Sequence, residues 1–303
     1  MSVNSSSSSS DSLRHPNISS IIYNLPLDMH CYVTTPSSFI LTSFLITRTL
    51  LLLPLCIFII YHGLQQRRLN VSTSSAATMS HSDSFTYNMV TMEMIGVFGC
   101  ILMICGVYSD HYNIIIVGFF LSFLIWYGEM FFHLLTCVER YLAVVHPITY
   151  LSLRKERGIR IRNISIACVW LLSVVMVVLV VSEDATMVVD SCLSVFSLTV
   201  VSFCSVSVLC VLIGPGPGEQ GGDKKRVDQS KLRAFYTIMV ILGMLVLRFS
   251  WNLVANVNYL MEKGLECVMM SVGVWFNLPS SLVLPLLFLH RAGKLVCWKK
   301  NIQ

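Results

Sequence analysis

Apolar residues gather along this chain into seven runs, separated by shorter polar stretches. A helical run of about 20 apolar residues is long enough to cross a hydrocarbon core of roughly 30 Å. Backbone groups in lipid must satisfy their own hydrogen bonds, so runs this long predict helices rather than barrel strands. The sequence therefore predicts an all-α membrane protein with a seven-transmembrane helix bundle over residues 38–289. Its expected spans are 38–62, 86–108, 112–143, 163–182, 193–213, 233–258 and 268–289.

Composition agrees with this pattern. The chain has 303 residues, of which 55% are hydrophobic and only 12% are charged, and its mean hydropathy is +0.72. These values lie well outside those of soluble domains of similar length. The net charge of +5 does not indicate a nucleic-acid partner, because in a membrane protein the distribution of Lys and Arg between loops carries the information. The expected surroundings are a lipid bilayer.

Basic residues fall mainly on one side of the predicted bundle. They follow the first, third and fifth runs and the last run, whereas the loops on the other side are mostly acidic. The basic residues between the third and fourth runs are Arg154, Lys155, Arg157, Arg160 and Arg162. Cytoplasmic loops carry an excess of Lys and Arg. We therefore expect a multi-pass plasma-membrane protein with an extracellular N-terminus and a cytoplasmic C-terminus.

The first 37 residues are polar and rich in serine, which predicts a disordered extracellular tail. The tail has no charged segment followed by an apolar one, so we expect no cleavable signal peptide and a first span that acts as the anchor. Asn4 and Asn17 match the N-glycosylation sequon, and their predicted outside position favours modification. An unmodified tail is the alternative.

The chain has eleven cysteines, which differ in predicted depth. Six lie in apolar runs, where cysteine behaves as a small hydrophobic residue. Four lie near the oxidising outer face and permit two disulfides in three connectivities, namely Cys31, Cys105, Cys192 and Cys267. Cys297 follows the last span among basic residues beside Trp298, so it is a palmitoylation candidate, with an unmodified cysteine as the alternative.

Catalytic and metal-binding patterns are missing from the sequence. It contains no glycine-rich phosphate loop, no HExxH and no Cys/His pair at metal-ligand spacing. We therefore expect neither an enzyme nor a cofactor or metal site.

The stretch CVERYLAVVHP ends the third run with an acid and a base side by side. Together with seven spans and an outside N-terminus, it resembles the rhodopsin-like (class A) G-protein-coupled receptors. Their third helix ends in an acid-Arg-Tyr motif, which matches Glu139, Arg140 and Tyr141 here, and Pro147 matches the proline that follows. Trp170 falls where the family's fourth helix carries its tryptophan. The resemblance covers roughly residues 38–299.

The last run extends the resemblance. SSLVLPLLF is similar to the family's Asn-Pro-x-x-Tyr segment, with Pro285 retained, Leu284 in place of Asn and Phe288 in place of Tyr. The HRAGKLVCW stretch that follows resembles the family's short amphipathic eighth helix, so residues 290–303 are expected to form that helix and a cytoplasmic tail.

The resemblance implies a receptor that binds an extracellular ligand and activates a heterotrimeric G protein. Glu139 would restrain Arg140 at rest, and movement of the sixth helix would free Arg140 to face the G protein. The family's Cys-Trp-x-Pro motif in that helix is replaced by Arg248, Phe249, Ser250 and Trp251, which removes a hinge proline. The altered switch keeps open a seven-helix protein that does not couple: a decoy or scavenger, a chaperone partner, or a transporter-like channel.

A charge at Arg248, near mid-membrane, costs about 2.5–3.5 kcal/mol on insertion scales and is expected to have a partner. Glu129 of the third span is the predicted partner, and Glu93 of the second span comes next. Separate partners or water contacts are the alternative. Arg48, in the first span, is expected to lie closer to the outer face and to snorkel.

The ligand is expected among the outer helix ends, with Ser122, Trp126, Trp275 and Asn277 as candidate pocket residues. Ser122 stands where amine receptors of the family carry an Asp, which argues against a monoamine. Acidic outer loops favour a cationic or peptide ligand through electrostatic steering. The resemblance also implies two disulfides, one between Cys105 and Cys192 and one between Cys31 and Cys267.

Overall fold

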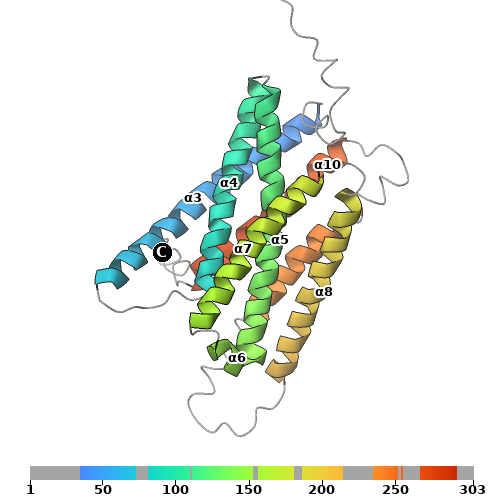
Figure 1. The fold of residues 1–303 in the computed structure, drawn as a ribbon. Helices are drawn as coiled ribbons and strands as arrows, with labels where there is room; N and C mark the ends of the chain where they lie inside the picture. The colour runs from blue at the N-terminus through green and yellow to red at the C-terminus, as the bar shows by residue number, and fades with distance from the viewer. Residues whose placement is uncertain are drawn as a thin grey trace, which may run out of the picture.

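The fold is described from a computed structural model over residues 35–72, 81–109, 111–152, 156–180, 186–213, 235–251, 254 and 267–291. All regular structure in these ranges is helical (Figure 1). The elements are α3 (Ser37–Ser72), α4 (His81–Tyr108), α5 (Tyr112–Val145), α6 (Pro147–Ser152), α7 (Glu156–Val180), α8 (Thr186–Ile213), α10 (Cys267–Gly273), the 3-10 turn η1 (Val274–Asn277) and α11 (Leu278–Arg291). A further apolar helix covers Phe235–Trp251.

Six helical segments are long and apolar enough to cross a membrane. They are Ser37–Gln65, Ser84–Tyr108, Asn113–Val145, Gly158–Leu179, Val188–Val211 and Cys267–Leu289. The prediction of an all-α, multi-pass membrane protein is therefore confirmed at this level. The predicted count of seven spans is not reached in the part of the chain that is described, because the helix Phe235–Trp251 is apolar but shorter than the other six.

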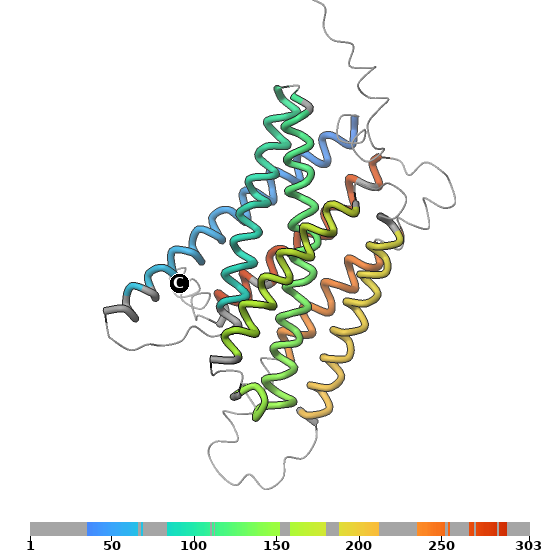
Figure 2. The backbone as a smooth tube through the Cα atoms, in the orientation of Figure 1, coloured from blue at the N-terminus to red at the C-terminus, as the bar shows by residue number. Residues whose placement is uncertain are grey.

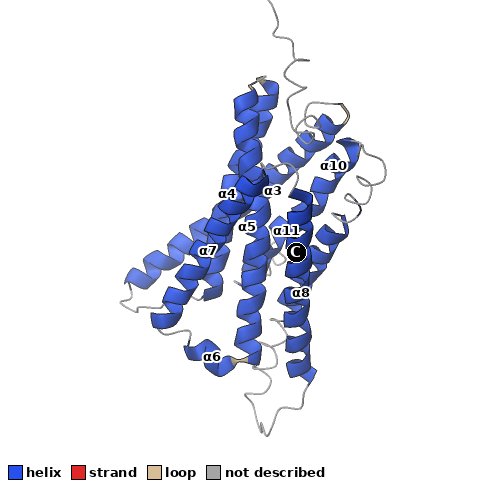
Figure 3. Ribbon diagram, turned by 45° about the vertical axis from the view of Figure 1, so that its right-hand side comes forward, coloured by secondary structure: helices blue, strands red, loops and turns tan. Residues whose placement is uncertain are grey.

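Helix α5 lies at the centre of the bundle. It contacts α4, α7, α8 and α11, and the small helix α6 packs at its C-terminal end. Figure 1 shows α4 and α5 as an antiparallel pair, with α8 on the other side of α5, and Figure 2 shows α3 crossing the pair obliquely. The turned view in Figure 3 agrees with this order. Side chains of α5 can therefore reach most of the other spans.

Glycines bring α4 and α5 close together. A Cβ added to Gly118 would lie 2.8 Å from the carbonyl oxygen of Gly99, and one added to Gly99 would lie 3.2 Å from the carbonyl oxygen of Gly118. Only glycine fits such an approach of two backbones. Small residues at helix crossings are the usual means of close packing in membranes.

The last span is broken in its middle. α10 and α11 are joined by η1, and Pro279 lies just after the start of α11. Proline lacks a backbone N–H and its ring clashes with the carbonyl four residues earlier, so a continuous α-helix cannot pass through this position. The 3-10 turn η1 connects the two α-helical segments at this break.

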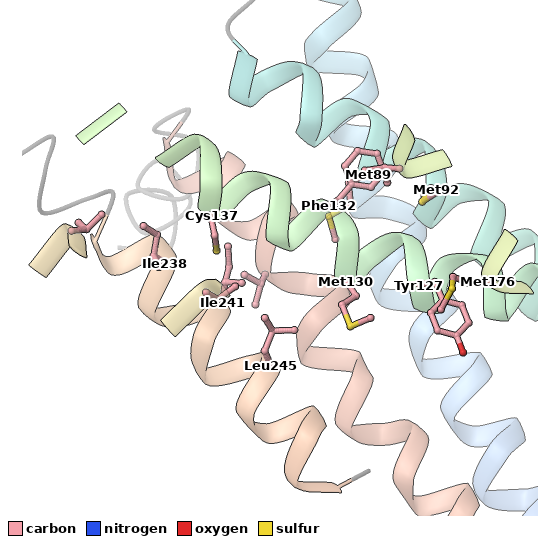
Figure 4. Packing of buried hydrophobic residues seen from close by; sticks show 14 residues of the cluster. Met89, Met92, Tyr127, Met130, Phe132, Cys137, Met176, Ile238, Ile241 and Leu245 are labelled. Carbon is pink, nitrogen blue, oxygen red and sulfur yellow. The ribbon is translucent and has the colours of Figure 1, made fainter. Parts of the chain in front are cut away.

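The largest core cluster contains methionines and aromatic rings of α4 and α5, among them Met89, Met92, Tyr127, Met130 and Phe132 (Figure 4). They pack against aliphatic residues of the other helices. Large apolar side chains are also exposed on the outward faces, including Leu171, Val178 and Phe203. A soluble protein rarely exposes so much apolar surface, whereas a bilayer covers it.

Candidate functional site

A charged cluster lies inside the bundle, where α3, α4 and α5 meet. Nη2 of Arg48 is 3.0 Å from Oε2 of Glu93 and 3.2 Å from Oε1 of Glu129. These residues are 7%, 0% and 2% exposed, respectively. The hydroxyl of Ser281, on α11, donates to the same oxygen of Glu129. The guanidinium of Arg48 therefore links α3, α4 and α5, and the hydroxyl of Ser281 adds a contact from α11.

The energetics of this cluster follow from its burial. A buried charge is expensive unless it is paired and hydrogen-bonded. Arg48 Nε and Glu93 Oε1 are buried and have no hydrogen-bond partner among the described residues, so the pairing is incomplete. Removal of one partner of a buried pair is much more costly than replacement of all partners by apolar groups.

The predicted bridge between Glu129 and Arg248 is wrong, and so is the expectation that Arg48 snorkels. Ion-pair distances in the described part of the chain join Glu129 to Arg48. The physical reason is the oblique path of α3, which carries Arg48 into the bundle at the depth of Glu93 and Glu129. The apolar pattern of one helix contains no information about that crossing.

Arg248 has a different environment. Its guanidinium carbon lies 3.7 Å from the ring centroid of Trp126, and its Nη2 donates to the Trp126 carbonyl at 3.1 Å. The indole N–H of Trp126 donates to Oδ1 of Asp190, on α8, at 3.2 Å. A cation over an indole face is stabilised by the ring's quadrupole, more strongly when it is desolvated. This Arg248–Trp126–Asp190 cluster joins the Phe235–Trp251 helix, α5 and α8.

The four predicted pocket residues do not form one group of contacts. Trp126 belongs to the Arg248 cluster. The hydroxyl of Ser122 donates to the Gly118 carbonyl and lies 3.5 Å from the sulfur of Met103, so it faces α4. Trp275 packs edge-on against Phe44 of α3, at 5.7 Å between ring centroids. Asn277 is buried, its Nδ2 donates to the Val274 carbonyl, and its Oδ1 has no partner among the described residues.

The glutamate and arginine of the acid-Arg-Tyr motif lie side by side at the end of α5. Arg140 Nε is 3.9 Å from Oε2 of Glu139, a long distance for an ion pair. The hydroxyl of Tyr150, on α6, donates to the other oxygen of Glu139 at 2.9 Å. Tyr141 is hydrogen-bonded to His146 at 3.2 Å. Pro147 begins α6, which carries Tyr150 back to the end of α5.

The remaining switch candidates lie in packed positions. Phe288 contacts His62 of α3 and Tyr87 of α4 edge-on, at 6.3 and 5.6 Å between ring centroids, and Pro285 lies one turn earlier in α11. Trp251 stacks on Phe276 at 4.7 Å with an interplanar angle of 15°. Phe249 is half-buried.

Several site residues were not found by sequence reasoning. Tyr150, Asp190, Ser281 and the hydrogen-bonded pair His133 and Ser280, 3.0 Å apart, all lie at contacts between helices. The available signal was weak. A histidine in an apolar run is a hint of function, but a serine or a tyrosine in such a run is not.

One predicted disulfide is wrong. Cys105 and Cys192 are free and exposed in the structure. The end of α4 that carries Cys105 extends beyond the start of α8, which carries Cys192, and α5 lies between the two helices (Figures 1 and 3). Cys267 takes part in a disulfide. Its predicted partner Cys31 lies outside the described residues, as do Asn4, Asn17, Cys297 and the predicted eighth helix.

No protein-family model matches this chain, and no curated protein matches it either. Within the described residues, no three His, Cys, Asp or Glu side chains are grouped in a way that could hold a metal ion. The side chains described above offer charge pairing, hydrogen bonding and aromatic stacking.

Proposed function

We propose that the protein is a rhodopsin-like G-protein-coupled receptor of the plasma membrane, with an extracellular N-terminus and seven spans. The observation that carries the proposal is the Glu139–Arg140 pair at the end of α5, with Tyr150 of α6 on its carboxylate. The guanidinium of an arginine at a helix end can recognise carboxylate groups of a partner protein at the membrane surface.

The arrangement of helices supports the seven-span reading. Six segments have the length of a span, and the apolar helix Phe235–Trp251 occupies the place of the sixth span in chain order. The disulfide of Cys267 supports the orientation, since disulfides persist on the oxidising side of the membrane. Cys267 begins α10, at the end of the bundle opposite α6.

In the proposed mechanism, α5 connects the buried clusters to the end of the bundle that binds the G protein. Trp126 and Glu129 lie in the interior, and Arg140 lies at the end that faces the G protein. About 15 Å of helix separate Glu129 from Glu139, at 1.5 Å per residue. A ligand that shifts the Arg248–Trp126–Asp190 cluster moves the Phe235–Trp251 helix relative to α5. That motion opens the inner end of the bundle, and the basic inner loops and Arg140 then meet the G protein.

Altered motifs of the sixth helix favour a second candidate, a seven-helix protein that does not couple. The described part of that helix, Phe235–Trp251, contains neither a proline nor an acidic residue. It therefore lacks the usual hinge and any acid that could lock Arg140 at rest.

The test is G-protein activation in cells that express the wild type, Arg140→Ala or the control Arg68→Ala at equal surface levels. Arg68 is exposed near the C-terminal end of α3. We expect basal or ligand-stimulated activation in the wild type and the control, and a strong loss in Arg140→Ala. Silence of the wild type with every G-protein class across a broad ligand panel, or full activity of Arg140→Ala, would reject coupling and favour the second candidate.

A further inference from the structure

Arg248 is buried yet incompletely bonded. It is 3% exposed, and only its Nη2 has a hydrogen-bond acceptor among the described residues. Nε and Nη1 are buried without one, which leaves three N–H bonds of the guanidinium unused. An unsatisfied buried donor costs about 1–3 kcal/mol, and more when it is charged. A binding partner with acceptor oxygens would recover this energy.

Arg248 lies deep in the bundle but in the half opposite α6. It is about 20 Å along its helix from Phe235, out of a hydrocarbon thickness of roughly 30 Å. In the proposed orientation this is the outer half of the membrane. A small molecule from outside would meet Arg248 before it meets the Arg48 cluster.

An aromatic ring packs against Arg248, and a stacked aromatic pair includes a residue of the same helix. The ring of Trp126 lies under the guanidinium. Trp251 is three residues further along the same helix, so it projects near the same face one turn outward. It is stacked on Phe276 of η1. Trp126, Asp190, Trp251 and Phe276 are all half-buried, so the surroundings of Arg248 retain accessible surface.

From this arrangement we propose that Arg248 anchors the carboxylate of a small organic acid whose apolar body packs on Trp251 and Phe276. Charge-assisted hydrogen bonds from a guanidinium to a carboxylate are about twice as strong as neutral ones. A cationic ligand does not fit next to Arg248, and the carboxylate of Asp190 already accepts from Trp126. Acidic outer loops favour cations only at long range, whereas Arg248 acts at the site itself.

The proposal names the ligand class of the receptor proposed above and rests on that function for its signalling role. Binding itself is independent of coupling. Acid binding without G-protein activation would reject the receptor function alone. Activation without Arg248-dependent acid binding would reject this inference alone.

The test uses the purified full-length protein in a non-ionic detergent. Thermal unfolding is followed with octanoate and phenylacetate, and with the matched uncharged octanamide and phenylacetamide. We expect at least one acid to raise the melting temperature of the wild type in a saturable manner, whereas the amides do not. Arg248→Gln is expected to weaken acid binding by at least about tenfold, the loss of one 1.4 kcal/mol interaction. Arg68→Gln is expected to bind as the wild type does.

A second measurement covers the case in which Arg248→Gln does not fold. Terminally brominated octanoate is expected to quench tryptophan fluorescence of the wild type, and less so in Trp251→Phe. Unbrominated octanoate should reverse the quenching, and octanamide should not. The inference is overturned if neither acid binds the wild type, if acids and amides act alike, or if Arg248→Gln binds acids as tightly as the wild type.

Discussion

Arg48 on α3 and Glu129 on α5 form a buried ion pair, with 3.2 Å between Nη2 and Oε1. The same nitrogen of Arg48 also bonds Glu93 of α4. One guanidinium therefore joins three helices in the buried interior of the bundle. Substitutions in this cluster are therefore expected to lower the stability of the protein.

Substitution Arg48→Met is expected to destabilise the protein by about 3–5 kcal/mol, because it leaves two buried carboxylates without their cation. The measurement is the midpoint of thermal unfolding in detergent, together with surface expression. Arg68→Met, an exposed arginine on the same helix, is the matched control and should unfold as the wild type does. The triple variant Arg48→Met, Glu93→Gln, Glu129→Gln should recover much of the loss. An unchanged midpoint for Arg48→Met would contradict the buried pairing.

Double-mutant cycles test whether Arg48 or Arg248 pairs with Glu129. Arg48→Met and Glu129→Gln share a contact and are expected to couple by about 0.5–3 kcal/mol. Glu129→Gln and Arg248→Met share no ion pair, since Arg248 bonds the Trp126 carbonyl, so only longer-range attraction joins them and their coupling is expected to be smaller. Unfolding midpoints of the single and double variants provide both cycles. Strong coupling in the second cycle together with additivity in the first would show that Glu129 pairs with Arg248 after all.

Trp126 has two separable roles. Trp126→Phe keeps an aromatic face under Arg248 but loses the N–H that donates to Asp190, a bond to a charged group worth about 1.5–3 kcal/mol. Trp126→Leu also loses the cation–π contact, worth about 0.5–2 kcal/mol more. Thermal stability should therefore fall from wild type to Phe to Leu. Equal stability of the Phe and Leu variants would argue against the cation–π contact.

Tyr150 donates to one oxygen of the Glu139 carboxylate, and the other oxygen faces Arg140. Tyr150→Phe removes this hydrogen bond, so Glu139 is expected to pair more closely with Arg140 and to lower basal G-protein activation. The change should be at least about tenfold, because Glu139 is buried and a hydrogen bond to a charged group contributes about 1.5–3 kcal/mol. Glu139→Gln should act in the opposite direction. Basal activation at equal surface expression is the readout, and a rise in Tyr150→Phe would contradict this role.

Cys105 and Cys192 are expected to react with a membrane-impermeant maleimide on intact cells without prior reduction, because both are free and exposed. Cys105→Ser and Cys192→Ser should each remove one labelled site, as seen by peptide mass analysis. Labelling that appears only after reduction would restore the disulfide that the structure does not form. Labelling only after permeabilisation would reverse the proposed orientation.

By itself, the sequence determined that this is an all-α, multi-pass membrane protein. The length and apolarity of each run are properties of one segment, so α3, α4, α5, α7 and α8 start and end within ten residues of the predicted limits. The same holds for the apolar surface that faces lipid. The break in the last span was not predicted, since residues 268–289 were expected to form one uninterrupted span, although its cause is local, the proline at position 279.

Only the tertiary structure decided which charged groups meet. Glu129 was recognised as a partner for a buried arginine, but the arginine is Arg48 rather than Arg248. Asp190 and Tyr150 gained their roles from two other helices, α8 and α6, that contact α5. Partner choice depends on the tilt, rotation and depth of each helix relative to its neighbours. Packing between helices sets those quantities, and no single apolar run encodes them.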